Sequence, residues 1–164
     1  MKENSSIKEQ VLRPEPKAKA AAPAKAREVT EEQTDNCAEE LDERICTALR
    51  AASDKKALEM VVLDLREVAS FTDYFVITSG TNVRQVQAIA DDVVEQLKKQ
   101  GTRAARVEGY NTAEWVLVDY GDFIVHVFED KARRFYDLER LWRDAKRVPL
   151  PADLVGPDSS LRSE

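Results

Sequence analysis

The chain has 164 residues, 43% of them hydrophobic and 34% charged, which is enough for one domain with a real hydrophobic core. No apolar run approaches the roughly 20 residues needed to cross a bilayer, so we expect no membrane contact. Residues 1–30 hold seven Lys/Arg and four Glu, a net charge of +3, whereas residues 31–164 hold 18 Lys/Arg and 27 Asp/Glu, a net charge of −9. An acidic globular part argues against phosphate backbone as the main partner and suits a basic protein surface, although mild acidity can also serve only to keep a protein dissolved.

Residues 1–36 predict a disordered tail. The stretch 13–34 consists mainly of Pro, Ala, Lys and Glu and contains no aromatic residue, so it cannot bury enough apolar surface to offset the entropy lost on ordering. A flexible spacer is the favoured interpretation, and a weak contact between its basic segment and RNA is the alternative. The first residues lack the apolar stretch of a secretory signal, and their glutamates argue against an organellar presequence.

Cys37 and Cys46 are nine residues apart, and the one histidine, His126, is distant from both in sequence. This spacing matches no zinc-binding or redox motif. We therefore expect two free thiols in a reducing cytoplasm, with no metal and no cofactor.

The first half of the domain predicts a helix followed by two strands. From residue 38, apolar residues recur at helical spacing, and acidic residues occupy the first turns, where the helix dipole favours negative charge. The apolar positions are Leu41, Ile45, Leu49 and Ala52. The apolar run 58–65 is too short for a helix of that burial and suits an inner strand. A polar connection over 66–73 leads to a second strand over 74–78.

The second half predicts a central helix, three strands and a closing helix. Asn82 and Gln85 have the spacing of a capping box, and Gly101 marks the end of the central helix. Residues 104–108 predict a third strand, and the alternation over 115–128, broken at a Gly-Asp pair, predicts a hairpin. The closing helix should run from about residue 131 to 145 and cover one face of the sheet. Its apolar residues are Phe135, Leu138, Leu141 and Trp142.

These elements predict a compact α/β single domain over residues 38–146, with a mixed five-stranded sheet flanked by helices. The strands on either side of the central helix should run parallel through a right-handed crossover, and the last hairpin is antiparallel. Prolines end the closing helix, and residues 147–164 are expected to form a flexible C-terminal tail.

Nothing in the sequence amounts to a catalytic set. Ser79 precedes a helix N-terminus, as in phosphate-binding turns, but neither a Gly-rich run nor a Lys follows it. Asp119 and Asp122 flank the hairpin turn, and we expect one of them to serve the turn rather than a metal ion. His126 lies among apolar neighbours, where a packed histidine with one hydrogen bond is commoner than a catalytic base.

Trp115 shares a strand face with Leu117 and Asp119, whereas Val116 and Val118 make the better core face. If the valine face packs inward, Trp115 and Leu117 form an apolar patch with acidic residues at its rim, as in a protein-binding hot spot. Core packing of Trp115 beneath a helix is the alternative.

Three segments of the chain carry a specific spacing of residues. They are 72–81 (TDYFVITSGT), 108–128 (EGYNTAEWVLVDYGDFIVHVF) and 133–142 (RRFYDLERLW). Together they resemble the ribosomal silencing factor family, also called Iojap-like. The resemblance covers roughly residues 40–145.

The resemblance implies a regulator and not an enzyme. Such a protein binds the large ribosomal subunit through ribosomal protein L-fourteen, sterically blocks joining with the small subunit and thereby represses translation. The implied fold is nucleotidyltransferase-like without the catalytic carboxylates. The implied partner-binding residues are Glu108, Asn111, Trp115, Leu117, Asp119, His126, Arg134 and Tyr136. A homodimer that uses the same patch is compatible with the resemblance, and no specific nucleic-acid contact is expected beyond nearby rRNA.

Two alternatives stay open at this point. Organellar members of the family are linked to assembly of the large subunit, and an assembly factor could use the basic tail to bind RNA. A residual nucleotidyltransferase that uses Ser79, Asp119 and Asp122 would instead show Mg²⁺-dependent nucleotide binding.

Overall fold

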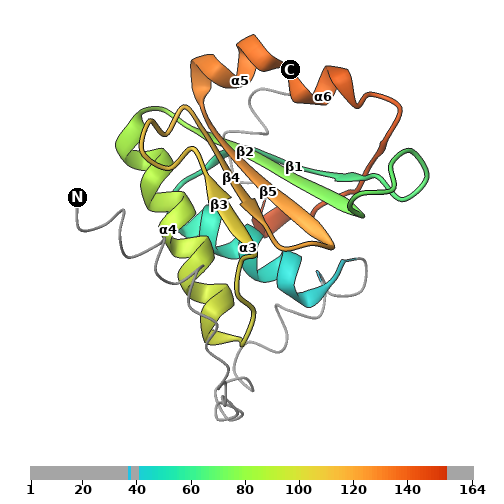
Figure 1. Cartoon of the computed structure of the whole chain (residues 1–164), viewed down its shortest axis with the longest axis horizontal. Helices are drawn as coiled ribbons and strands as arrows, with labels where there is room; N and C mark the ends of the chain where they lie inside the picture. The colour runs from blue at the N-terminus through green and yellow to red at the C-terminus, as the bar shows by residue number, and fades with distance from the viewer. Residues whose placement is uncertain (1–36, 38–40, 155–164) are drawn as a thin grey trace.

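A mixed sheet forms the centre of the protein in this computed structural model, which describes residue 37 and residues 41–154. The sheet has six strands in the order β3-β4-β5-β2-β1-β6, with helices on both faces (Figure 1). The elements in chain order are α3 (Glu43–Asp54), β1 (Leu58–Asp64), β2 (Tyr74–Gly80), α4 (Val83–Lys99), β3 (Arg106–Glu108), β4 (Trp115–Asp119), β5 (Phe123–Glu129), α5 (Asp130–Tyr136), α6 (Leu138–Leu141) and β6 (Lys146–Arg147).

The mixed α/β architecture is confirmed, but the predicted count of five strands is wrong. The sixth strand, β6, has only two residues, which pair with Leu63 and Asp64 of β1. So short a strand produces no alternating pattern that a sequence could show. β2 and β5 pair in parallel, and the other pairs are antiparallel. The strands on either side of α4, β2 and β3, therefore run in the same direction as predicted, with β5 and β4 between them.

The helices α3 and α4 cover one face of the sheet and enclose the larger part of the core (Figure 1). α4 begins at Asn82, whose side chain accepts a hydrogen bond from the Gln85 amide, as the capping-box spacing predicts. The inward residues of β4, Val116 and Val118, lie in the same buried cluster as the apolar stripe of α4. The valine face of the hairpin is therefore the core face, as predicted.

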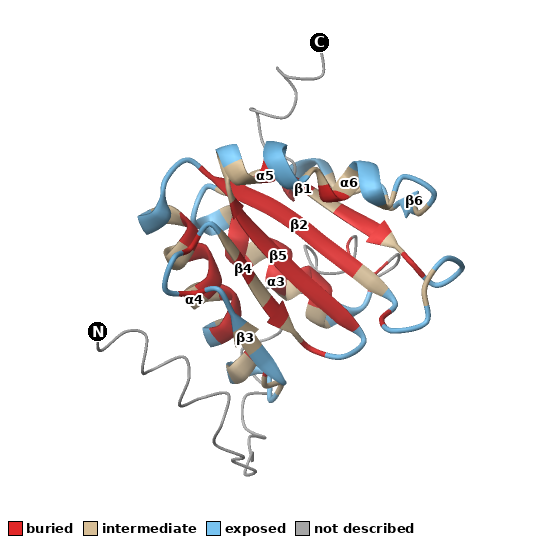
Figure 2. Cartoon of the chain, turned by 45° about the horizontal axis from the view of Figure 1, so that its top comes forward, coloured by how far each residue is buried: buried red, intermediate tan, exposed pale blue. Residues whose placement is uncertain are grey.

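The opposite face of the sheet is covered by the two short helices α5 and α6 (Figure 2). The prediction of one continuous closing helix is wrong, because Asp137 has a left-handed backbone (φ +49°) that separates α5 from α6. The break changes the direction of the apolar stripe, so that Leu138 is buried while Phe135 is 78% and Leu141 is 72% exposed. This face of the domain therefore keeps exposed apolar side chains.

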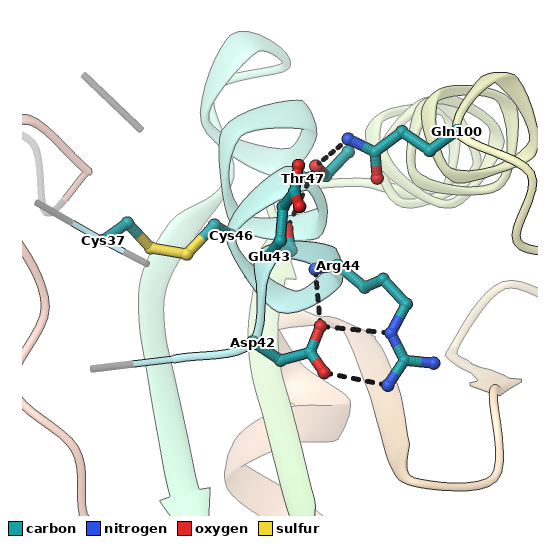
Figure 3. The surroundings of a disulfide bond; sticks show 7 residues. All are labelled: Cys37, Asp42, Glu43, Arg44, Cys46, Thr47 and Gln100. Carbon is teal, nitrogen blue, oxygen red and sulfur yellow. Dashed lines mark hydrogen bonds and ion pairs between the residues drawn. A yellow bond between two sulfur atoms is a disulfide. The ribbon is translucent and has the colours of Figure 1, made fainter. Parts of the chain in front are cut away.

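A disulfide joins Cys37 to Cys46 at the start of α3 (Figure 3), so the prediction of two free thiols is wrong. The Cα atoms are 6.0 Å apart, within the range that a disulfide spans. Both side chains are buried. Sequence spacing could not show this, because a separation of nine residues does not by itself bring two sulfur atoms within bonding distance.

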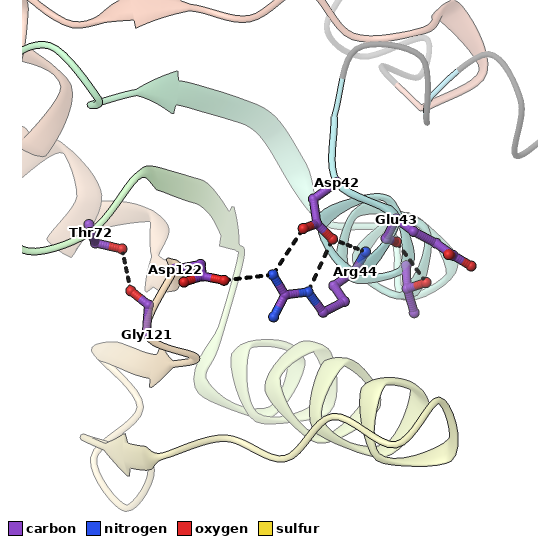
Figure 4. Close-up of polar contacts among 7 residues, drawn as sticks. Asp42, Glu43, Arg44, Thr72, Gly121 and Asp122 are labelled. Atoms are coloured by element: carbon purple, nitrogen blue, oxygen red, sulfur yellow. Dashed lines mark hydrogen bonds and ion pairs between the residues drawn. The ribbon is translucent and has the colours of Figure 1, made fainter. Parts of the chain in front are cut away.

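Arg44 connects the start of α3 to the turn between β4 and β5 (Figure 4). Its guanidinium donates hydrogen bonds to Asp42 and to Asp122, each at 2.9 Å, and the bond from Arg44 lowers the pKa of Asp42 below its ordinary value. On the far side of the same turn, the Thr72 hydroxyl donates to the Gly121 carbonyl at 2.8 Å. The hairpin turn is thus tied both to α3 and to the loop before β2.

Residues 147–154 lie against the domain, so the C-terminal tail predicted from residue 147 begins too early. The Val148 amide donates to the Val62 carbonyl at 2.9 Å, and Leu154 is buried. The segment is short and rich in proline, and it therefore lacks the periodicity that marks a packed element. The tails predicted over 1–36 and 155–164 lie outside the described residues. Within the described part of the chain, no helix has the length and apolar character needed to cross a membrane.

Candidate functional site

The register of the hairpin gathers several of the predicted site residues on the face that α5 and α6 cover. Trp115 of β4 pairs with Phe128 of β5, and Leu117 pairs with His126. Directly paired residues point to the same side of a sheet, so these four side chains share one face. Glu108 of β3 pairs with Leu117 and extends the row to the edge of the sheet.

Trp115 is held by contacts on several sides of its indole. Its Nε1 donates a hydrogen bond to His126 Nδ1 at 3.0 Å. The ring stacks on Phe128 with centroids 4.9 Å apart, and Tyr136 of α5 lies against it with centroids also 4.9 Å apart. Trp115 is half-buried as a result. Part of its side chain packs against the sheet and α5, and the rest is open to solvent.

His126 is a neutral hydrogen-bond acceptor in this site. It is 2% exposed, and burial lowers its pKa to about 3, because desolvation disfavours the charged imidazolium. Since Nδ1 accepts the Trp115 hydrogen bond, the proton of the neutral ring lies on Nε2. Among the described residues, Nε2 has no hydrogen-bond partner. His126 therefore orients Trp115 and is not poised as a base near neutral pH.

A row of aromatic rings continues from His126 across the face. The Phe75 ring lies 4.4 Å from His126 and 5.8 Å from Trp142, measured between centroids, and Phe71 lies 5.9 Å from Trp142. At the other end, Phe135 meets Tyr136 edge-on at 5.0 Å. We call this row the aromatic face. Its members are Phe71, Phe75, Trp115, His126, Phe135, Tyr136 and Trp142.

Both ends of the aromatic face are open to solvent. Phe135 is 78%, Phe71 58% and Tyr136 46% exposed, and α6 adds the exposed Leu141 nearby in sequence. Exposed aromatic side chains are typical of protein-binding surfaces. Between the two ends, Phe75 and His126 are buried and Trp115 and Trp142 are partly buried, so the exposed rings are anchored to the sheet.

The structure brings together four of the eight predicted site residues: Trp115, Leu117, His126 and Tyr136. Glu108 lies beside Leu117 in the register, with its carboxylate 3.2 Å from the Arg106 guanidinium.

The remaining three predicted residues lie apart from the aromatic contacts. The Asp119 carboxylate accepts from the Gly121 amide at 2.8 Å and therefore serves the hairpin turn, as the sequence predicts for one of the two aspartates. Asn111 is exposed in the connection between β3 and β4. Arg134 is exposed and pairs with Asp130 at 3.1 Å along α5. That all eight residues take part in partner binding stays a prediction.

Sequence reasoning missed Phe71 and placed Phe135 and Leu141 in the wrong environment. Phe71 falls in a polar connection, and an aromatic residue isolated among polar ones was the only available signal. Phe135 and Leu141 fit a continuous helical stripe, and only the left-handed residue Asp137 moves them out of it. An aspartate inside a helical pattern is too common to predict such a break.

The residues considered for nucleotide chemistry have structural partners. The Ser79 hydroxyl is fully buried and accepts a hydrogen bond from Arg133 at 3.1 Å, and Asp122 pairs with Arg44. In the part of the chain that the structure describes, no group of three or more His, Cys, Asp or Glu side chains is placed to hold a metal ion.

Comparison with known proteins links this architecture to one family. Residues 38–163 match the family model described as "ribosomal silencing factor during starvation". The ribosomal silencing factor RsfS of Halalkalibacterium halodurans is 44% identical over 103 residues, which cover 63% of this chain and 88% of that protein. A crystal structure of a protein from Bacillus halodurans is 41% identical with a TM-score of 0.60, covering 66% of this chain and 98% of that one. A more distant relative, the mouse protein named "mitochondrial assembly of ribosomal large subunit protein 1", is 32% identical over 91 residues, which cover 54% of this chain and 40% of that protein.

Proposed function

Because this chain belongs to the ribosomal silencing factor family, a family of non-enzymatic regulators, we propose that it binds the large ribosomal subunit and represses translation. In this proposal the aromatic face docks on ribosomal protein L-fourteen. The bound domain then occupies space that the small subunit must enter, so the block is steric. The protein acts in the cytoplasm, where the ribosome is found, and the fold is related to nucleotidyltransferases without performing their chemistry.

The observation that carries the proposal is the exposure of the aromatic face. Phe71, Phe135 and Tyr136 project into solvent from a row whose centre is buried and hydrogen-bonded. Hot spots of protein interfaces have this construction, in which aromatic anchors stand on a rigid base and become desolvated when the partner docks.

The charge of the domain agrees with a basic protein partner. Residues 31–164 carry a net charge of −9, and Glu108 lies at the strand edge next to Leu117. Complementary charge raises the rate of encounter more than the final affinity. The aromatic side chains therefore supply most of the binding affinity, and the acidic residues raise the rate at which the protein meets its basic partner.

Sedimentation of ribosomal subunits tests the proposal directly. Purified large and small subunits are run on sucrose gradients with and without the full-length protein, and with the variants Phe135→Ala and Phe71→Ala. The wild-type protein should sediment with the large subunit and reduce formation of the joined ribosome. Phe135→Ala should weaken binding by about 2 kcal/mol or more, roughly thirtyfold, if the ring is a hot-spot anchor.

Val83→Ala is the matched control for these variants. Val83 is an exposed apolar residue (41%) at the start of α4, on the opposite side of the sheet, so its removal should leave subunit binding unchanged. If subunits join freely in the presence of the wild-type protein, the silencing role is wrong. Binding that survives both Phe135→Ala and Phe71→Ala would show instead that another surface docks.

A role in assembly of the large subunit is the second candidate, because the mouse relative carries that function in its name. The two roles differ in what a cell without the protein accumulates. An assembly factor leaves incomplete large-subunit particles when its gene is deleted. A silencing factor leaves complete particles and raises translation in starved cells.

A further inference from the structure

The end of the aromatic face formed by Phe135 and Tyr136 lies on α5, and both α5 and α6 are too short to be stable as isolated helices. α5 has seven residues and α6 has four, whereas isolated helices below roughly 12–15 residues are marginal in water. Their position must therefore come from tertiary contacts. The buried residues of these helices are Arg133 in α5 and Leu138 in α6. Arginine is rarely buried in proteins unless its charge is paired.

The guanidinium of Arg133 joins four parts of the structure. Its Nε and Nη2 donate to the two carboxylate oxygens of Glu139 in α6, at 3.1 and 3.3 Å. Its Nη1 donates to the Ser79 hydroxyl at the end of β2, at 3.1 Å, and to the Leu58 carbonyl at the start of β1, at 3.3 Å. One side chain thus ties α5 to α6 and both helices to the sheet.

β1 is irregular at its start, close to the carbonyl that Arg133 contacts. The register of β1 against β2 shifts between Leu58 and Val61, and Glu59 between them has a positive φ of +43°. The Leu58 carbonyl, next to this irregularity, accepts hydrogen bonds from the side chains of Thr78 and Arg133.

Glu139 is held from a second side as well. Arg147 of β6 donates to the same carboxylate at 3.2 Å, so the acid lies between two guanidinium groups. The two-residue strand β6 places Arg147 there by pairing with the end of β1. The contacts of Arg133 are therefore fixed by the bulge of β1, the end of β2 and the last strand together.

We propose that Arg133 is the positioning residue of the aromatic face, holding α5 and α6 so that Tyr136 packs on Trp115 and Phe135 is presented to the large ribosomal subunit. Arg133 is only 6% exposed, so it acts through these rings and does not touch the partner. The inference rests on the proposed function of the aromatic face and adds the residue on which the geometry of that face depends.

Arg133→Lys is the test variant, with Arg44→Lys as its matched control. Lysine keeps the charge but presents a single ammonium, which cannot reproduce the two-pronged contact with Glu139 while also reaching Ser79 and Leu58. Arg44 also joins two carboxylates, but at the start of α3 and away from the aromatic face. We expect Arg133→Lys to bind purified large subunits at least tenfold more weakly, and Arg44→Lys to bind them as the wild type does.

Hydrogen exchange supplies a readout that a general loss of stability would not give. In Arg133→Lys, amides of residues 130–142 should exchange faster, while those of α3 and α4 keep their wild-type protection. If Arg133→Lys does not fold, Glu139→Gln replaces it. Glutamine has nearly the same volume as glutamate but carries no charge, and its single amide oxygen cannot accept both hydrogen bonds from the guanidinium.

A mutant cycle shows whether Arg133 acts through Phe135 and Tyr136. Adding Arg133→Lys to Phe135→Ala/Tyr136→Ala should weaken binding no further, because both rings that Arg133 positions are already absent. Fully additive losses, or weak binding of Arg133→Lys with unchanged exchange, would overturn the positioning role. So would wild-type binding by Arg133→Lys while Phe135→Ala is weakened. If Phe135→Ala and Tyr136→Ala also bind normally, the aromatic face itself is the wrong site, and the positioning role falls with it.

Discussion

The indole of Trp115 and the imidazole of His126 depend on one another. Trp115 needs an acceptor for its Nε1 proton in a site that is largely dry, and His126 supplies it at 3.0 Å only while Nδ1 carries no proton. Burial keeps the ring neutral by lowering its pKa to about 3. The geometry of Trp115 should therefore be independent of pH across the neutral range.

The same burial makes His126 the source of an acid-sensitive stability. A folded-state pKa of about 3 lies below the ordinary value of 6.5, so the unfolded chain binds the proton more readily as pH falls below 6.5. The free energy of unfolding should fall by about 2 kcal/mol between pH 7 and pH 5, at up to about 1.4 kcal/mol per pH unit. Urea unfolding at pH 7, 6 and 5 measures this slope.

His126→Asn is the control for that slope. The asparagine oxygen can accept the Trp115 hydrogen bond but does not titrate, and the chain holds a single histidine. The carboxyl groups of Asp42 and Asp64 have pKa values lowered by Arg44 and Arg66, so they lose their pairs only at lower pH. A slope between pH 7 and pH 5 that persists in His126→Asn would contradict the assignment.

Gly109 is required for the approach of its loop to β4. Its φ is +80°, and a Cβ at this position would overlap the carbonyl oxygen of Trp115. We expect Gly109→Ala to lower the free energy of unfolding by about 2 kcal/mol or more, since backbone strain and steric overlap combine. Gly101→Ala is the matched control, because Gly101 has a similar φ of +91° with nothing within 4 Å of the added methyl group. Equal losses in the two variants would show that the contact with Trp115 does not matter.

Two short segments determine which side chains of the closing part of the chain are buried and which remain exposed on the aromatic face. The left-handed residue Asp137 divides the closing helix, and β6 adds a pair of residues at the far edge of the sheet. Neither has a strong local signal, yet together they place Leu138 inward and Arg147 next to Glu139. The arrangement of side chains on the aromatic face therefore depends on the irregular segments near it and not on its long helices and strands.

The disulfide ties Cys37 to α3. Cys37 and Cys46 close a short loop, and the entropy removed from the unfolded chain by a loop of this size corresponds to about 2–3 kcal/mol. Urea unfolding with and without a reducing agent should show a loss of this size. In Cys46→Ala the reducing agent should have no effect. Alkylation of both cysteines in denatured protein that was never reduced would contradict the disulfide.

The two faces of the sheet differ in how completely helices cover them. α3 and α4 close one face over the main core. On the other face, α5 and α6 are largely exposed (Figure 2), and the exposed side chains of α5 include Phe135 and Tyr136. An exposed apolar surface that has no partner can also bind a second copy of the same chain. We propose that the free protein dimerises through the aromatic face, and that dimerisation and binding to the large subunit exclude one another.

Sedimentation velocity of the purified protein tests the dimer. Phe135→Asp places a charge in the proposed contact and should shift the protein to monomer, since a buried unpaired charge is costly. Val83→Asp, on the opposite side of the sheet, should leave the association state unchanged. A dimer whose dissociation constant is the same in wild type and Phe135→Asp would show that the two contacts use different surfaces.

The sequence alone predicted the features that have a local physical cause. The hairpin followed from a period of two broken at Gly121-Asp122, the start of α4 from the cap at Asn82, and the core face from the valines of β4. The family followed from residues with a fixed spacing in three segments. In each case neighbours in sequence are sufficient to produce the pattern.

Tertiary structure decided the features that need distant parts of the chain to meet. The Cys37–Cys46 disulfide joins residue 37 to a position inside α3. The three partners of Arg133, which are Glu139, Ser79 and Leu58, come from separate elements. The left-handed residue Asp137 interrupts an otherwise helical pattern, with the exposed Phe135 on one side of it and the buried Leu138 on the other. The periodicity of apolar residues in the sequence indicates which side chains share one face of a helix or strand. Whether such a face is covered depends on tertiary packing, here the packing of α5 and α6 on the sheet.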